Sequence, residues 1–261
     1  DRQPMNFGRA WAVPLIPLCL WLILLASGKE VEVFLWLNQA AQVLPNWAWA
    51  WFTFLGNGWG IFALCFPLVL YAPRQLCAAL ISGAIAALIS LTLKPLIGLP
   101  RPAGVLSENS FYLLGDPLLH HALPSGHTLT VFSVASALFF STPHPKRNLF
   151  SVLFVLAALT GISRNAVGAH WPGDVLVGSA LGIWCGLIAS RWVLRIKDHQ
   201  LSPTSSIARV IAVAGFGVLY VLQTRVLDFP HNQALQYVGS AIVLITLVLF
   251  VLRQNKPQNY V

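Results

Sequence analysis

Long apolar runs alternate with short polar connections along the chain. An apolar stretch of about 20 residues can cross a bilayer as a helix, and we expect eight such spans, at residues 11–27, 47–71, 75–96, 127–141, 149–162, 175–192, 207–226 and 237–252. The pattern therefore predicts an all-α fold, a polytopic transmembrane helical bundle. The second span contains Gly56-Asn57-Gly58 and should be kinked or broken there. The aromatic, amphipathic stretch 31–44 is expected to lie flat at the membrane interface.

The composition agrees with a membrane protein. Hydrophobic residues make up 57% of the chain and charged residues 9%, against about 25% charged residues in soluble domains. The net charge of +8 comes without a basic run interleaved with aromatic residues, so we expect the lipid bilayer and no nucleic acid as a partner. The four cysteines stand singly in or beside apolar runs, at spacings that indicate neither a metal site nor an obvious disulfide.

Basic residues divide unequally between the two sides of the predicted bundle. With the N-terminus inside, eleven of the sixteen lysines and arginines fall on the inner side, as the positive-inside rule expects. Among the five on the outer side are Lys94, Arg101 and Arg164. Cations that break the rule need a local reason, and binding of an anion supplies one. We therefore expect a multi-pass protein of the inner (plasma) membrane with its active site facing the periplasm or exterior.

Two polar clusters border the third and fourth spans on this outer side. Lys94 and Arg101-Pro102 close the third span, where three prolines should stop the helix and hold the two cations near each other. Pro124-Ser125-Gly126-His127 opens the fourth span. Ser125 is a candidate N-cap, Gly126 lets a ligand approach the backbone, and the free N–H groups of a helix start can bind an anion.

A third cluster lies between the fifth and sixth spans and contains Ser163, Arg164, His170 and Asp174. Pro172 favours an extended residue before it and can start a helix, so His170 should sit in the loop and Asp174 in the first helical turn. Asp174 could then accept a hydrogen bond from the imidazole, which fixes the tautomer and leaves the other nitrogen free to attack. Taken alone, Arg164 could be a snorkelling cation and Asp174 a helix-dipole partner. Together with His170 they indicate a functional site.

The three clusters have a characteristic order and spacing. They read Lys, six residues, Arg-Pro; then Pro-Ser-Gly-His; then Ser-Arg, five residues, His, three residues, Asp. With these eleven residues the chain resembles the type 2 phosphatidic acid phosphatase superfamily of membrane lipid phosphatases, over about residues 76–192. The resemblance implies a six-helix phosphatase core, to which the last two predicted spans are an addition.

The resemblance also implies a role for each motif residue. His170 would be the nucleophile that forms a phosphohistidine, Asp174 would orient it, and His127 would be the general acid. The phosphoryl oxygens would be bound by Lys94, Arg101, Ser125, the amide of Gly126, and Arg164. Three fixed cations can neutralise these oxygens without a metal ion, and the sequence contains no carboxylate cluster to hold one. We therefore expect neither a metal nor a cofactor.

These observations predict an integral membrane enzyme that removes phosphate from an envelope lipid. The candidate substrates are undecaprenyl diphosphate, which we place first, phosphatidylglycerophosphate, phosphatidic acid and lipid A phosphate. A phosphotransferase that passes the phosphate to a second lipid would carry the same motifs. A haloperoxidase with a similar anion site would be soluble, and a non-enzymatic lipid transporter would be expected to have lost some of the eleven residues.

We expect three parts along the chain. Residues 1–74 hold two spans and the interfacial segment, residues 75–195 hold the three motifs, and residues 196–261 hold the two additional spans. The loop 103–123 lies on the side of the site, as a lid or a reader of the lipid headgroup, and its His120-His121 pair is expected to be solvated. The sequence determines neither the oligomeric state nor the role of the last two spans.

Overall fold

The computed structural model describes residues 8–107, 109–143 and 147–254, and within these ranges the regular structure is helical, without strands. Six helical segments are long and apolar enough to cross a membrane. A seventh is formed if α3 (Asn46–Phe54) and the stretch Gly58–Tyr71 count as one bent span. The chain is therefore an all-α, multi-pass membrane protein, as its hydrophobic pattern predicts.

Each of the eight predicted spans corresponds to helical structure. The first span is α1 (Leu15–Ser27), and the second comprises α3, α4 (Gly58–Cys65) and α5 (Leu68–Tyr71). The remaining spans are α6 (Pro73–Ile97), α7 (Gly126–Ser141), α9 (Val152–Ala166), α10 (Pro172–Trp192), α11 (Ser206–Thr224) and α12 (Gln233–Gln254). Of these helices α7 is apolar but shorter than a full span.

Helices α6, α7, α9 and α10 form the centre of the bundle, and α7 packs most closely against α10. The contact is close because α10 carries glycines at four-residue intervals. A Cβ on Gly182 would lie 2.6 Å from the carbonyl oxygen of Leu129, and one on Gly186 would collide with the Cβ of Ser136. Small residues at this spacing let two membrane helices approach along their backbones. The beginning of α7 and the beginning of α10 are thereby held next to each other.

The second span is broken where the sequence predicts it. The axes of α3 and of the stretch Gly58–Tyr71 differ by 70°. Asn57 starts α4, and its side-chain oxygen accepts hydrogen bonds from the backbone N–H groups of Trp59 (3.0 Å) and Gly60 (3.4 Å). Gly56 lies so close to α7 that a Cβ there would be 2.7 Å from the Cβ of His127. The break therefore brings polar backbone into the neighbourhood of a motif residue.

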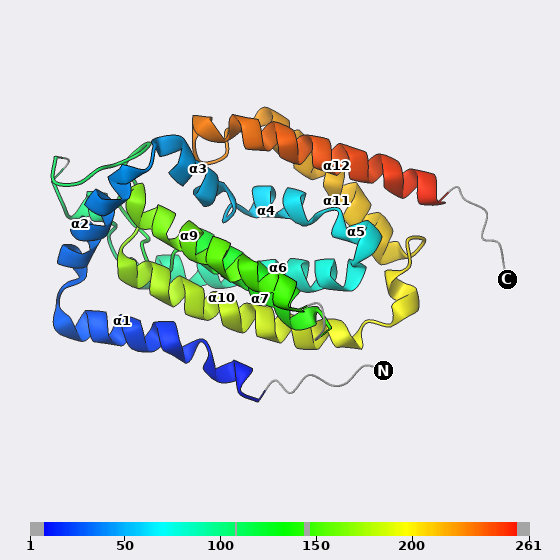
Figure 1. Ribbon diagram of the computed structural model, residues 1–261, viewed down its shortest axis with the longest axis horizontal. Helices are drawn as coiled ribbons and strands as arrows, with labels where there is room; N and C mark the ends of the chain where they lie inside the picture. The colour runs from blue at the N-terminus through cyan, green and yellow to red at the C-terminus, as the bar shows by residue number, and fades with distance from the viewer. Residues whose placement is uncertain (1–7, 108, 144–146, 255–261) are drawn as a thin grey trace.

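The last two helices pack mainly on the broken span. Buried side chains from α4–α6 and from α11 and α12 share one apolar cluster, which includes Phe66, Leu76, Val218 and Val243. Figure 1 shows α11 and α12 on the side of α4, with the loop that joins them reaching the end of the bundle near α3. Residues 196–254 are thus joined to the N-terminal spans through a common core. The three-part division of the chain stays a prediction.

The stretch predicted to lie at the interface forms α2 (Glu30–Ala40), at the opposite end of the bundle from the start of α1 and the end of α12 (Figure 1). Its side chains Phe34 and Asn38 are buried. The amide of Asn38 donates to the carbonyl oxygens of Tyr112 and Asn165, both at 2.9 Å, and its oxygen accepts from the N–H of Tyr112 at 2.7 Å. The helix α2 therefore fastens the loop before α7 to the end of α9.

Candidate active site

The three motif clusters meet around one cavity of about 370 Å³. It forms at one end of the bundle because α6 and α9 end there and α7 and α10 begin there. Six of the eight predicted site residues line the cavity, namely Lys94, Arg101, Gly126, His127, Arg164 and His170. The other two, Ser125 and Asp174, are buried and lie outside this lining. The connection between α11 and α12 also contributes, through Asp228 and Phe229.

His170 lies in the turn between α9 and α10 and is 2% exposed. Its Nδ1 is 3.1 Å from Oδ2 of Asp174, so the expected hydrogen bond is present. The same Oδ2 accepts the backbone N–H of Trp171 at 2.9 Å, as part of a capping arrangement at the start of α10. The carboxylate is thereby held in place from two sides. This bond makes Nδ1 the protonated nitrogen and leaves Nε2 as the nitrogen with a free lone pair.

The surroundings of His170 favour its neutral form. Burial lowers the pKa of His170 well below its ordinary value, and the positive charges of Arg101, Arg164 and Lys94 lower it further. The imidazole is therefore neutral at neutral pH. Neutral imidazole is the form that can attack an electrophile.

Lys94 and Arg101 are held by the loop that follows α6. Our expectation that prolines stop this helix is wrong for Pro95, because α6 continues through it to Ile97. Gly98 ends the helix instead, with a left-handed φ of 63° and an N–H bonded to the carbonyl of Lys94. Near a helix end a proline removes one hydrogen bond and the neighbouring bonds persist.

The same loop gives each cation a backbone partner. Nζ of Lys94 donates to the carbonyl oxygen of His121 at 3.0 Å, and Nε of Arg101 donates to that of His120 at 2.9 Å. Nη1 of Arg101 also donates to the carbonyl oxygen of Ala169, beside His170, at 3.2 Å. The His120-His121 pair thus contributes backbone oxygens that orient the cations.

Arg164 is the most buried of the three cations, at 5% exposure. Its Nη1 donates to Oγ1 of Thr53 at 3.1 Å, and that hydroxyl is 2.9 Å from Oγ of Ser163. Its Nε has no hydrogen-bond partner among the described residues. An unpaired, buried guanidinium N–H carries a desolvation cost. An anion in the cavity that Arg164 lines would offset the cost of burying its positive charge.

The start of α7 differs in detail from the expectation. Ser125 is the N-cap residue, but its side chain makes no capping hydrogen bond. Its Oγ accepts from Oγ1 of Thr128 at 2.9 Å, and its N–H donates to the carbonyl oxygen of Asp174 at 3.0 Å. Ser125 thereby ties α7 to α10, and Gly126 and His127 are the residues of this motif that line the cavity. A contact between Ser125 and a phosphoryl oxygen stays a prediction.

Two carboxylates that line the cavity, Asp116 and Asp228, belong to none of the three motifs, and Asp228 is the one bonded to His127. Oδ1 of Asp228 is 2.8 Å from Nε2 of His127, and its Oδ2 accepts from Nδ2 of Asn57 at 3.0 Å. Burial raises the pKa of Asp228, but the positive charges of His127 and Arg164 and the hydrogen bonds from His127 and Asn57 lower it more, so it lies below its ordinary value. Sequence reasoning missed this residue because it is 101 positions from His127 and outside any motif. The sequence feature that could have indicated it is an acidic side chain in the connection between the last two spans, on the same side of the membrane as the site.

The arrangement is suited to phosphoryl transfer. Three cations can neutralise phosphoryl oxygens, a neutral imidazole can attack phosphorus, and a second imidazole can supply a proton. Each imidazole is hydrogen-bonded to a carboxylate. Within the described part of the chain, no group of three or more His, Cys, Asp or Glu side chains could hold a metal ion.

Comparison with known proteins defines the class. A family model described as the PAP2 superfamily matches residues 75–198, from α6 to the residues just after α10. The crystal structure of LpxE from Aquifex aeolicus resembles this chain with a TM-score of 0.54 and 30% sequence identity, over 62% of this chain and 94% of that one. The chain belongs to the PAP2 superfamily, which confirms the resemblance stated from the motifs.

Two curated relatives are similar over shorter stretches. An undecaprenyl-diphosphatase from Sulfolobus acidocaldarius is 32% identical over 109 residues, which is 42% of this chain and 50% of that protein. A lipid A 1-phosphatase from Porphyromonas gingivalis is 42% identical over 94 residues, 34% of this chain and 21% of that protein. The chain thus spans half or less of the length of these relatives. Asp228, α11 and α12 lie outside the segment that the family model matches.

Proposed function

We propose that this protein is an integral membrane phosphatase that removes phosphate from an envelope lipid through a phosphohistidine intermediate. The observation that carries the proposal is the neutral His170, held by Asp174, on a cavity that is lined by three cations. Phosphoryl transfer depends mainly on positioning and on neutralising the charge of the phosphoryl oxygens. Lys94, Arg101 and Arg164 would supply that charge, together with the backbone at Gly126.

The reaction would proceed in two steps. In the first, Nε2 of His170 bonds to phosphorus, the bond between phosphorus and the leaving oxygen breaks, and His127 gives that oxygen a proton. In the second, water attacks phosphorus, His127 takes a proton from the water, and the bond between phosphorus and nitrogen breaks to release phosphate. Asp174 would stabilise the positive charge that the His170 ring carries while it is phosphorylated.

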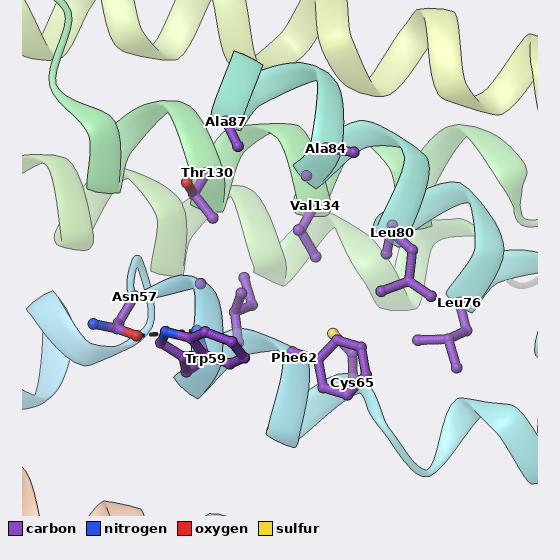
Figure 2. Close-up of a pocket in the computed structure, with 14 residues that line it drawn as sticks. Asn57, Trp59, Phe62, Cys65, Leu76, Leu80, Ala84, Ala87, Thr130 and Val134 are labelled. Carbon is purple, nitrogen blue, oxygen red and sulfur yellow. Dashed lines mark hydrogen bonds between the residues drawn. The ribbon is translucent and has the colours of Figure 1, made fainter. Parts of the chain in front are cut away.

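An apolar cavity beside the site supports a lipid substrate. It has a volume of about 690 Å³ and lies between α4 and the helices α6 and α7 (Figure 2). Phe62 faces it from α4, Leu80 and Ala84 from α6, and Val134 from α7. Asn57, which also lines it, is hydrogen-bonded to Asp228 in the site cavity. An apolar tail in this space would leave the phosphate of the same molecule near His170. A water-soluble phosphate ester has no such tail and would not fill this cavity.

The location and the preferred substrate belong to the same proposal. Arg74 lies in the first turn of α6 and Arg253 in the last turn of α12, at the end of the bundle away from the site, in keeping with the positive-inside rule. We therefore place the protein in the inner (plasma) membrane with its site facing the periplasm or exterior. Undecaprenyl diphosphate stays the first candidate, supported by the similarity to an undecaprenyl-diphosphatase. Phosphatidylglycerophosphate, phosphatidic acid and lipid A phosphate are the others.

The test is a panel of phosphate donors. Purified protein in detergent is incubated with each of the four lipids and with glucose 6-phosphate, and released phosphate is measured. We expect release from at least one lipid and far less from glucose 6-phosphate. His170→Ala should be inactive, whereas His199→Ala, in the short helix Asp198–Leu201 remote from the site, should match the wild type.

Two outcomes would change the proposal. If no lipid releases phosphate, or if glucose 6-phosphate is the better substrate, the lipid phosphatase is refuted. If phosphate leaves the donor and appears on an added second lipid instead of in solution, the protein is a phosphotransferase with the same intermediate.

A further inference from the structure

We propose that Asp228 is a positioning residue for His127, orienting its imidazole and favouring the protonated form so that the second ring nitrogen can deliver a proton to the leaving oxygen. The inference rests on the proposed function, in which His127 is the general acid. The inference also connects the last two helices with the site, because the loop that contains Asp228 joins α11 to α12.

The geometry assigns different tasks to the two nitrogens of His127. Nε2 is 2.8 Å from Oδ1 of Asp228, a distance at which the ring N–H donates to the carboxylate. With Nε2 held in this way, Nδ1 is the nitrogen that can release a proton to the leaving oxygen and later take one from water. The pair repeats, on the second imidazole, the relation between His170 and Asp174. The nucleophile and the acid would each have their own carboxylate.

The loop around Asp228 is built to hold this side chain in place. Asp228 has a left-handed φ of 60°, a conformation that non-glycine residues adopt rarely and that needs support from the surrounding structure. The support comes from two buried side chains. Gln236 accepts from the N–H of Leu227 at 3.2 Å, and Asn232 donates to the carbonyl oxygen of Leu227 at 3.0 Å. The next residue, Phe229, is buried in an apolar cluster with side chains of α3 and α9.

The broken second span approaches the same pair from the other side. Nδ2 of Asn57 donates to Oδ2 of Asp228 at 3.0 Å, so both carboxylate oxygens have a partner. Gly56 makes this approach possible, because a Cβ there would collide with the Cβ and the carbonyl oxygen of His127. Segments that are remote in the sequence therefore converge on one imidazole. A carboxylate serving only to close a loop would not need to face a motif histidine.

The charges around His127 explain why it needs a carboxylate. Arg164 from α9, Lys94 from α6 and the imidazole of His170 share the cavity with it, and positive charges nearby disfavour a second positive charge on the imidazole. A general acid must hold its proton when the substrate binds. Asp116 lines the same cavity from the loop before α7, but the carboxylate bonded to the His127 ring is that of Asp228. Asp228 is thus placed to offset, at the acid, the positive charge of the neighbouring cations.

The first test uses Asp228→Asn, which keeps the shape of the side chain and tolerates a left-handed φ. The kcat is measured on phosphatidic acid, whose leaving alkoxide is strongly basic, and on undecaprenyl diphosphate, whose leaving lipid phosphate is far less basic. We expect kcat to fall about 10- to 100-fold on phosphatidic acid, less than about 3-fold on the diphosphate, and KM to change little, because only a basic leaving group requires the acid. Equal losses on both lipids, or a rise in kcat, would overturn the inference.

Controls separate positioning from folding. Asp228→Gly also removes the carboxylate and accepts a φ of 60° without strain, so it should reproduce the Asp228→Asn pattern. Asp198→Asn removes a carboxylate that is ion-paired with Arg74 at the opposite end of α6, and it should leave both rates unchanged. The double variant His127→Ala, Asp228→Asn should be no slower than His127→Ala alone, because the second residue acts through the first. If the losses in kcat of the two single variants multiply in the double variant, Asp228 has a role independent of His127.

A final measurement does not depend on turnover. In protein with isotope-labelled histidine, the NMR signals of His127, assigned with His127→Gln, are followed against pH in the wild type and in Asp228→Asn. We expect His127 to lose its proton at a lower pH in the variant. If the wild type hydrolyses no lipid phosphate, the proposed function fails, but this titration still tests the pairing. An unchanged titration would show that Asp228 does not control His127.

Discussion

Replacing Asp174 by asparagine removes one negative charge from beside His170 and preserves the shape of the side chain. Oδ2 of Asp174 accepts from Nδ1 of His170 at 3.1 Å and from the N–H of Trp171 at 2.9 Å. Because the Trp171 N–H can only donate, the asparagine should place its amide oxygen at this position. The tautomer of His170 is then kept, and the variant loses charge but not orientation.

The size of the effect follows from this geometry. In the proposed reaction the His170 ring becomes positive when it bonds to phosphorus, and a charge about 4 Å away at an effective dielectric constant of about 20 would contribute about 4 kcal/mol. A neutral hydrogen bond to the His170 ring remains in the variant and recovers part of the lost stabilisation. Neutral hydrogen bonds are roughly half as strong as charge-assisted ones. We expect a net loss of about 2 to 4 kcal/mol, or about 30- to 1,000-fold in kcat. An inverted tautomer would cost more, about 10⁴-fold by comparison with a Ser–His–Asp triad.

The assay compares kcat of the wild type, Asp174→Asn and Asp198→Asn on the lipid that the panel identifies. Binding of vanadate, an analogue of the transferred phosphoryl group, is measured in parallel. We expect vanadate still to bind to Asp174→Asn, because the three cations that line the cavity are unchanged. A kcat within 3-fold of the wild type would refute the role given to the carboxylate. A loss beyond about 10⁴-fold would refute the argument that the tautomer is preserved.

Four further predictions follow from the same structure. His127→Ala should lower kcat at least about 10-fold more on a monophosphate lipid than on undecaprenyl diphosphate; equal losses would mean that His127 binds phosphate and does not donate a proton. A cysteine at Val105, which is exposed beside the site, should react with an impermeant thiol reagent in intact cells, whereas one at the exposed Asn148 should not. Labelling of the wild type gives the background, and the reverse result would place the site on the cytoplasmic side. Activity should survive EDTA and be inhibited by vanadate, and a preparation that loses activity on chelation and regains it with magnesium would contradict the phosphohistidine scheme. Asn38→Leu should lower the unfolding free energy by about 1 to 3 kcal/mol for each backbone group of Tyr112 and Asn165 that is left unpaired; an unchanged melting temperature would show that α2 does not fasten these loops.

The order of helices could be predicted from the sequence because it depends on local properties. A chain in lipid must satisfy its backbone hydrogen bonds within each helix, so every apolar run of sufficient length becomes helical whatever its neighbours are. The break near Asn57 was predictable for the same reason, since two glycines flank a residue that can cap a helix. Most of the candidate site could also be predicted from the sequence, because its motifs lie at span ends on one side of the membrane. The bond between His170 and Asp174 joins residues four positions apart and needs only the local turn that begins α10.

The tertiary structure alone decided which distant groups meet. Ser125 is engaged by Thr128 and by the backbone of Asp174, which follows from the close packing of α7 on α10. The pairing of Asp228 with His127 depends on where the loop between α11 and α12 reaches the bundle, and a short connection carries no periodicity that reports its direction. A hydrogen bond requires its two atoms to lie within about 3 Å, whereas hydrophobic patterning determines only which membrane face a loop occupies. The sequence by itself therefore determined the helices and the chemistry of the three motifs, and the packing of those helices determined which carboxylate the second histidine receives.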